Sequence, residues 1–372
     1  MNIIKPQYEI IEQNIDDLLV DMFKHIEICG RTCYKSEDKI TEYSYKKFVK
    51  KLTDSDHGAM LEHGTVYLTI PLGTPVDDIQ YMWKMDIVKF FQDNKYSVVK
   101  KKSVNKTVNV EIKGYGMKTQ ASATFYYITT NWRVIVENKD FEILKYMGQM
   151  KSITESLKDS VLQWMTKPTE DHEKRYTVRF TYHLAVARDI NRHRVQSVGE
   201  ESTRYCNYSK EKFGGGELNY IEPVFLTDAE KEILNDPKEH LSFEAMCNQI
   251  GNGSYYSSFE AIDYFIFALE ACEFAYINLI KLGWTPQKAS LVLPLDTKTC
   301  SVHTAFASDW CHFFNLRALG TTGSPRPSAK EVAVPLMLDF IARNYISSHD
   351  IDIEKYNKIQ NKYPIIEDYI KL

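Results

Sequence analysis

The chain of 372 residues has no long uninterrupted hydrophobic run. A membrane-spanning helix needs about 20 largely apolar residues. The best candidate, 261–282, is interrupted by polar residues such as Asp263, Glu270, Glu273 and Asn278. The amino-terminal segment MNIIKPQYEI lacks the apolar centre of a secretion signal. We therefore expect a buried helix over this run, no membrane partner and a cytoplasmic location.

The sequence also lacks a strong excess of charge of either sign. The net charge is −4 and 26% of the residues are charged, as is ordinary for a globular protein. No general basic field draws such a chain to nucleic acid or anionic lipid, so any polyanion must be held by a local basic cluster. A nucleic-acid-binding module is a remote alternative, because no basic stripe supports it.

The pattern of the seven cysteines does not suggest a disulfide framework. Their number is odd and they are widely scattered, which indicates free thiols in a reducing compartment. Cys29 and Cys33, with His25 one turn before them, could begin a zinc site, but a second pair of ligands is missing. We expect no metal site.

Helices and strands are predicted in an irregular order, without an internal repeat. Apolar periodicity and strand-favouring residues predict the following elements. Helices are expected at 12–30, 39–53, 77–94, 141–165, from Leu184, at 258–282, from Pro286, at 303–319 and from a capping-box sequence at 328–331. Strands are expected at 65–70, 123–130, 132–138 and 174–183. This order favours the α+β class, with helices packed on a sheet rich in antiparallel strands.

The stretch 187–205, ARDINRHRVQSVGEESTRY, carries the densest chemical information. It contains four arginines, namely Arg188, Arg192, Arg194 and Arg204. Guanidinium groups form rigid forks that match phosphate, so the cluster suits a nucleotide or dinucleotide. The alternative from composition alone is a solvated charged face with internal Arg–Glu pairs.

The order of these residues resembles the signature of the flavin-dependent thymidylate synthases. That signature is Arg-His-Arg, here Arg192-His193-Arg194, followed by seven residues and a serine, here Ser202. Ser197, Glu200, Arg204 and Tyr205 also occupy positions of the longer family pattern. Two further segments resemble the family, namely His57–His63 before a strand, and Leu291–Leu295 followed by Phe314–Arg317.

The resemblance implies a single domain over 1–372 that contains a family-variable insertion at 71–176. It implies conversion of dUMP to dTMP, with methylene-tetrahydrofolate as carbon donor, FAD as cofactor and NADPH as reductant. It also implies a homotetramer with shared active sites. Methylation or hydroxymethylation of another pyrimidine nucleotide, such as dCMP or UMP, is the alternative.

The resemblance also assigns roles to individual residues. Arg317 matches the catalytic arginine that faces the pyrimidine and favours ionisation at its N3. The expected cofactor-binding residues are His57, Ala59, Arg192, His193, Arg194, Glu200, Ser308 and His312. The expected substrate-binding residues are Asp189, Arg192, Glu200, Glu201, Ser202, Thr203, Arg204 and Arg317. Ser202 has no His–Asp relay near it in sequence, so we interpret it as a binding hydroxyl.

Several positions depart from the family pattern. Gly199 stands where compact members carry Asn, and Ser290 stands where relatives often have a phosphate-binding Arg. His312 and Phe306 occupy places of flavin-contacting asparagines. Asp189 would repel phosphate unless Arg188 or Arg192 neutralises it. These changes leave open a phosphate held by the insertion, or a substrate other than dUMP.

Overall fold

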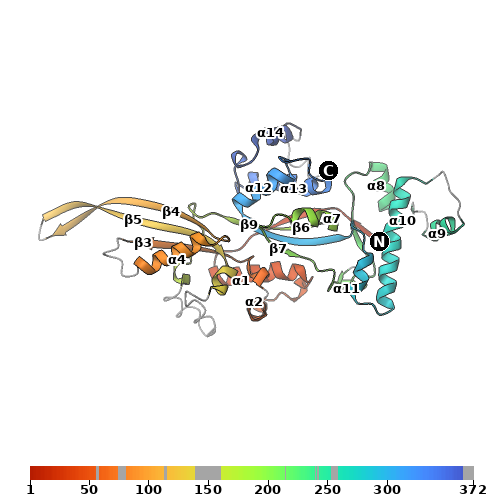
Figure 1. The fold of residues 1–372 in the computed structure, drawn as a ribbon, viewed down its shortest axis with the longest axis horizontal. Helices are drawn as coiled ribbons and strands as arrows, with labels where there is room; N and C mark the ends of the chain where they lie inside the picture. The colour runs from red at the N-terminus through yellow and green to blue at the C-terminus, as the bar shows by residue number, and fades with distance from the viewer. Residues whose placement is uncertain are drawn as a thin grey trace.

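The protein is elongated, with helices on both sides of a central sheet and a long β-hairpin at one end (Figure 1). The computed structural model describes nine parts of the chain, namely 1–55, 58–73, 81–112, 115–138, 161–213, 215–238, 240, 243–252 and 259–362. Several expectations fall wholly or partly outside them, among them His57, residues 77–80 of the helix predicted at 77–94, and most of the helix predicted at 141–165. Within that helix, Val161–Trp164 forms a 3-10 turn.

The central sheet has four antiparallel strands in the order β2-β6-β9-β7. They are β2 (Gln7–Ile11), β6 (Arg175–His183), β9 (Lys298–Phe306) and β7 (Ser197–Glu200). The register pairs Arg175 with Phe306 and Ser197 with Thr304. Segments far apart in sequence therefore meet at the end of this sheet where β6 begins.

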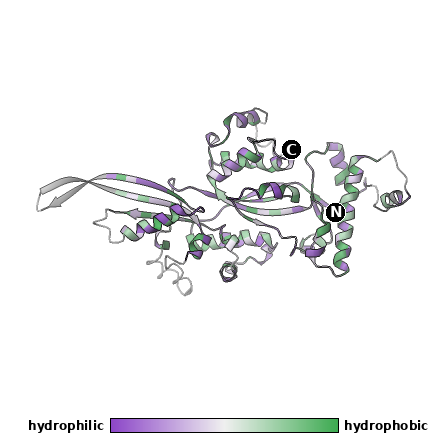
Figure 2. Ribbon diagram, viewed as in Figure 1, coloured by the Kyte–Doolittle hydropathy of each residue, from purple (hydrophilic) through white to green (hydrophobic). Residues whose placement is uncertain are grey.

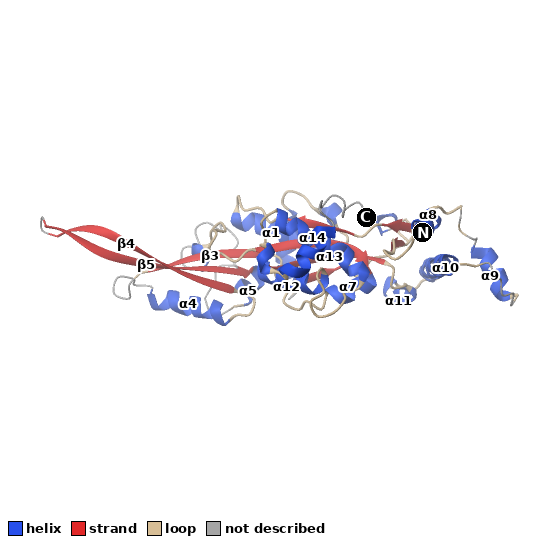
Figure 3. Cartoon of the chain, turned by 90° about the horizontal axis from the view of Figure 1, so that it is seen from above, coloured by secondary structure: helices blue, strands red, loops and turns tan. Residues whose placement is uncertain are grey.

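A second sheet lies beside that end, in the order β3-β5-β4. Its strands are β3 (Thr65–Leu72), β4 (Val98–Ile112) and β5 (Tyr115–Asn131), so the predicted insertion supplies β4 and β5. The β4–β5 hairpin continues well beyond β3 and twists away from the body (Figure 3). A short parallel pair joins β1 (Asn2–Ile4) to β8 (Asn219–Ile221).

Helices cover both faces of the central sheet. On one side lie α1 (Leu18–Cys33), α2 (Ser44–Asp54) and α3 (Gly58–Leu61), which pack in a core with β3, β5 and α4 (Tyr81–Asp93). On the other side lie α7 (Leu184–Ile190), α12 (Ala307–Arg317), α13 (Pro327–Ala342) and α14 (Ile353–Lys362). This arrangement confirms the predicted α+β class.

The remaining helices are short or lie at the far end of the molecule. They are α5 (Trp132–Glu137), α8 (Asp228–Asn235), α9 (Phe243–Gly251), α10 (Ala261–Lys281) and α11 (Pro286–Ala289). The further 3-10 turns are Glu37–Lys39, Glu211–Phe213, Ser290–Val292 and Ser348–Asp350.

The long apolar run forms α10, as predicted, and Gly283 follows it with a φ of +92°. Apolar residues continue along much of this helix (Figure 2). The helix is only partly buried, because Ile266 and Leu269 are covered while Tyr264 and Phe274 are exposed. In the described part of the chain, no helix has both the length and the apolarity that a membrane span requires.

The predicted strand at 132–138 is wrong, because Trp132–Glu137 is the helix α5. The side chain of Asn131 caps this helix by accepting a hydrogen bond of 3.1 Å from the backbone N–H of Val134. Its β-branched residues Val134, Ile135 and Val136 are all buried, so tertiary packing overrides their preference for strands.

Two helix starts are also wrong. The predicted helix at 303–319 begins only at Ala307, because His303–Phe306 continues the buried strand β9. The predicted capping box at 328–331 is not the start of α13. That helix begins at Pro327, with Arg326 at its N-cap and no side-chain cap bond.

Candidate functional site

The Arg-His-Arg triplet lies in the turn that joins α7 to β7. Arg192 and Arg194 are exposed, whereas the His193 ring is buried against the side of α12. Its centroid lies 4.9 Å from that of Phe313 and 5.9 Å from that of His312. The triplet thus directs its two arginines to solvent and anchors itself through the histidine.

Arg317, at the end of α12, binds this turn directly. Its Nε donates to Nε2 of His193 at 3.0 Å, and its Nη2 donates to the carbonyl of Asp189 at 2.6 Å. Burial and the Arg317 cation lower the pKa of His193 to about 4, so the imidazole is neutral and its Nε2 can accept a hydrogen bond. Two residues assigned to one site from separate sequence blocks are therefore in contact.

The carboxylate of Asp189 is neutralised by Arg326. Its Oδ2 accepts from Arg326 Nε at 2.9 Å, whereas Arg188 and Arg192 make no ion pair among the described residues. The expectation that Arg188 or Arg192 balances Asp189 is therefore wrong. Sequence analysis missed Arg326, because it belongs to the Gly/Ser/Pro loop before α13 and resembles no family motif. The contact comes only from packing α13 beside α7.

A cavity of about 440 Å³ lies along the strip from Val198 to Tyr205. Glu200, Glu201, Ser202, Thr203 and Arg204, all expected to bind substrate, line it. Cys33, Tyr34 and Met60 of the amino-terminal helices form the opposite wall. The strip is fixed by its backbone, because Glu201 N donates to the Cys300 carbonyl at 2.7 Å and Ser202 N donates to the Cys33 carbonyl at 3.1 Å.

Glu200 is held at the edge of this cavity. Its carboxylate accepts hydrogen bonds from Asn191 Nδ2 at 2.7 Å and from Thr299 Oγ1 at 3.3 Å. Burial raises the pKa of Glu200, although these hydrogen bonds oppose that shift. The carboxylate can therefore form a hydrogen bond with a polar ligand in the cavity.

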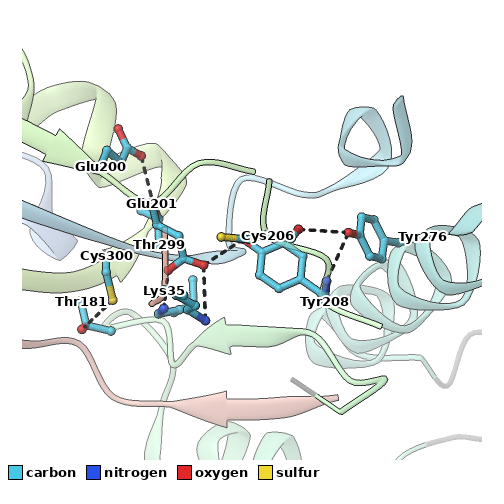
Figure 4. Close-up of polar contacts among 10 residues, drawn as sticks. Lys35, Thr181, Glu200, Glu201, Cys206, Tyr208, Tyr276, Thr299 and Cys300 are labelled. Atoms are coloured by element: carbon cyan, nitrogen blue, oxygen red, sulfur yellow. Dashed lines mark hydrogen bonds and ion pairs between the residues drawn. The ribbon is translucent and has the colours of Figure 1, made fainter. Parts of the chain in front are cut away.

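Glu201 is a buried carboxylate that lies near Lys35 and Tyr208 (Figure 4) and also pairs with Lys298. It lies 2.6 Å from Lys298 Nζ and 3.4 Å from Lys35 Nζ, and it accepts a hydrogen bond of 3.2 Å from Tyr208 OH. Burial alone would lower the pKa of Lys298, but Glu201 raises it overall, so the pair is ionic. With both oxygens engaged inside the protein, Glu201 supports the strip rather than presenting a free carboxylate to a ligand.

A second cavity, of about 360 Å³, lies at the junction of the two sheets. Arg194 and Ser308, both expected to bind the cofactor, line it together with Arg175, Ser197 and Phe306. Lys95 and Tyr96 of the insertion complete the wall. Sequence analysis missed Arg175, Lys95 and Tyr96 as site residues, because they lie in the insertion, which resembles no motif of the family.

The structure thus distributes the expected residues over three neighbouring places. Arg317, His193, Asp189 and His312 form one group, the 200–204 strip lines one cavity, and Arg194 with Ser308 lines the other. Ala59 is exposed on α3, next to the cavity residue Met60. His57 lies outside the described residues. The described part of the chain holds no cluster of three potential metal ligands.

The alternative of a solvated face with internal Arg–Glu pairs is correct in the exposure of the arginines, but the described residues do not show the pairs. Arg188, Arg192, Arg194 and Arg204 are all exposed, and none forms an ion pair with a carboxylate in the part of the chain that the structure describes. Arg204 lies over the ring of Tyr205, at 5.3 Å from its centroid. These guanidinium groups are free to meet an anion.

Close packing explains why a glycine occupies position 199, and it predicts that a larger residue there would destabilise the fold. A Cβ at this position would lie 2.6 Å from Cys33 Sγ and 3.0 Å from Met60 Cε. We expect Gly199→Ala to reduce the free energy of unfolding by about 1–3 kcal/mol, as overpacking does. Urea unfolding measures this, with Gly251→Ala as the matched control, because nothing lies within 4 Å of its added Cβ. Equal stability of the two variants would contradict the prediction.

Comparison with known proteins gives one family, and similar solved structures that include two of the same protein. The family described as thymidylate synthase complementing protein, Thy1, matches residues 120–322. The UMP/dUMP methylase PolB from Streptomyces cacaoi bound with 5-Br dUMP is 14% identical, with a TM-score of 0.34, over 92% of this chain and 93% of that one. PolB bound with 5-Br UMP is 21% identical, with a TM-score of 0.31, over 45% and 68% of the two chains. No curated protein matches the chain.

Proposed function

The chain belongs to the Thy1 family of thymidylate synthase complementing proteins, and from this premise we propose that it is a flavin-dependent pyrimidine nucleotide C5-methyltransferase that converts dUMP to dTMP. The contact between Arg317 and His193 carries the proposal. These residues are 124 positions apart, yet Arg317 Nε donates to the histidine of the triplet at 3.0 Å. Two motifs that resemble one family's site therefore meet in space.

The proposed nucleotide site is the cavity along the 198–205 strip. Its volume of about 440 Å³ lies in the range of small-ligand sites. Arg204 supplies the exposed cation for the phosphate, and the Ser202 hydroxyl and Glu200 supply polar contacts. Ser290 lies outside the cavity lining, and its hydroxyl donates to the carbonyl of Gln287 at 3.0 Å. A phosphate bound by Arg204 alone would therefore be bound more weakly than one that a second arginine, at the position of Ser290, also contacts.

The residues at the sheet junction fit an anionic flavin dinucleotide. Arg194 has no carboxylate partner among the described residues, and Nε of Arg175 is buried without a hydrogen-bond partner there. We propose that Arg194 and Ser308 hold FAD, with His193 fixing the turn behind them. When bound, reduced flavin supplies the hydride, methylene-tetrahydrofolate the carbon and NADPH the reducing electrons.

The protein's own contribution is binding, orientation and charge. We propose that Arg317 faces the pyrimidine and stabilises the negative charge that develops when N3 loses its proton. Its two hydrogen bonds to His193 and to the Asp189 carbonyl fix the guanidinium before the substrate arrives. Because its counterpart His193 is neutral, the positive charge of Arg317 is not cancelled on that side.

We further propose a homotetramer in which subunits share the sites. In the part of the chain that the structure describes, the 200–204 strip lines one cavity and Arg194 with Ser308 lines another, which supports completion of the site by another copy. Light scattering on the active protein tests this. A monomer with full activity would contradict it.

Absorption spectroscopy followed by turnover tests the proposed function. The purified protein, loaded with FAD, should show a flavin spectrum that dithionite bleaches. It is then given methylene-tetrahydrofolate, NADPH and, in separate reactions, dUMP, UMP or dCMP. Conversion of dUMP to dTMP supports the proposal. Turnover of UMP or dCMP without dUMP would replace the substrate, and a protein that binds no FAD would overturn the flavin assignment.

A further inference from the structure

The insertion contributes a short, well-fixed turn to the cavity at the sheet junction. This turn, 94–97, joins α4 to β4. The Asn94 carboxamide oxygen accepts hydrogen bonds from Tyr96 N at 2.9 Å and from Ser97 Oγ at 3.2 Å. Ser97 Oγ also shares a hydrogen bond of 2.8 Å with Thr130 Oγ1 of β5. The turn is therefore tied to the insertion's sheet and holds its side chains in place.

Lys95 projects from this turn without an acidic partner. Its ammonium lies 4.8 Å from the centroid of the Tyr96 ring, and it forms no ion pair among the described residues. Other lysines at this end of the insertion are paired, since Lys100 meets Glu173 and Lys102 meets Asp171, both at 2.8 Å. Lys95 is thus an exposed cation beside a cavity.

The cavity has a clear excess of positive charge. Three cations line it, namely Lys95, Arg175 and Arg194, against the single carboxylate of Asp309. Arg175 makes no ion pair in the described part of the chain. Its guanidinium donates to the Glu62 carbonyl at 3.1 Å and to Ser197 Oγ at 3.2 Å. The guanidinium is partly buried and has no counter-charge in contact within the described ranges, so an anion in this cavity would be stabilised.

Aromatic rings lie next to these cations. Phe306 lines the cavity, with the Arg175 guanidinium 5.4 Å from its ring centroid, and Tyr96 of the insertion lines it as well. A ligand that carries both phosphate and a flat ring system matches this combination of cations and rings.

We propose that the 94–97 turn of the insertion forms one wall of the cofactor site, where Lys95 binds a phosphate of the flavin dinucleotide opposite Arg194. This inference rests on the proposed function and adds a role for the insertion. Lys95 is then a binding residue that Asn94 and Ser97 hold in position. The insertion takes no part in the chemical step.

The test measures flavin affinity by fluorescence quenching in the full-length protein. Lys95→Gln is compared with Lys89→Gln, an exposed lysine of α4 that does not line the cavity. FAD, riboflavin and NADPH are titrated separately. We expect Lys95→Gln to weaken FAD binding about tenfold, as loss of a charge-assisted phosphate contact does. Lys89→Gln should leave it unchanged, and riboflavin, which has no phosphate, should bind both variants equally.

The outcomes separate this inference from the proposed function. Wild-type protein that binds no FAD overturns the flavin assignment, and this inference with it. Wild-type binding with equal FAD affinity in the two lysine variants overturns only the role of the turn. The role of the turn would also be overturned if Lys95→Gln lost as much affinity for riboflavin as for FAD, or lost affinity for NADPH alone. Rescue by Lys95→Arg, which restores the cation, would support it.

Discussion

Replacement of Arg317 by glutamine is expected to lower kcat/KM for dUMP methylation by about a hundredfold, which corresponds to about 3 kcal/mol of transition-state stabilisation. The guanidinium is the fixed cation of the group at the end of α12. Glutamine can still donate one hydrogen bond, but it brings no charge to a pyrimidine that loses its N3 proton. Steady-state kinetics at pH 7.5 measure the effect.

A second readout separates this electrostatic role from a structural one. The Arg317 cation contributes to the low pKa of His193, after burial, so Arg317→Gln should raise that pKa from about 4. The wild-type imidazole should remain neutral at every pH above about 5, as histidine NMR can show. Arg343→Gln is the matched control, because Arg343 is exposed beyond α13 and pairs with Asp339. Activity of Arg317→Gln within threefold of this control would refute the role.

Replacement of Glu201 by leucine is expected to destabilise the fold by about 3–5 kcal/mol. The change leaves Lys298, whose side chain is 8% exposed, without its partner at 2.6 Å. Tyr208 also loses the acceptor of its hydroxyl, while Lys35, at 19% exposure, can reach water. A buried charge without a partner accounts for most of the loss. Urea unfolding at pH 7 provides the measurement.

A double variant tests that explanation. Glu201→Leu with Lys298→Met removes the unpaired charge, so it should recover much of the lost stability. Asp54→Asn is the control for an exposed pair, because Lys50 and Asp54 are both about 60% exposed and such pairs contribute about 0–1 kcal/mol. A single variant as stable as this control, or a double variant no better than the single one, would disprove the buried-pair account.

The predictions that succeeded depend on local chemistry. The strand at 123–130 lies within β5, and the strand at 174–183 is β6 almost to the residue. The helix after Thr285 begins with Pro286 at its first position, where a missing N–H is harmless. A helix was also expected from Leu184, and α7 begins at that residue, although it ends at Ile190, before the Arg-His-Arg triplet.

The predictions that failed depend on packing. Local strand preference could not reveal that 132–137 is a buried helix, because Asn131 and the core around Trp132 decide its form. The ion-pair partner of Asp189 could not be predicted from local sequence either, because Arg326 lies 137 positions away and reaches Asp189 only when α13 packs beside α7.

By itself, the sequence determined the family signature, the α+β class, and the residues that could meet a nucleotide and a flavin, because spacing and side-chain chemistry are local properties. Only the tertiary structure decided which of those residues touch. It placed Arg317 on His193, enclosed Glu201 between Lys298 and Lys35, and brought Lys95 of the insertion to the cavity of Arg194. Such contacts join distant segments, and they depend on strand register and helix packing that no local pattern encodes.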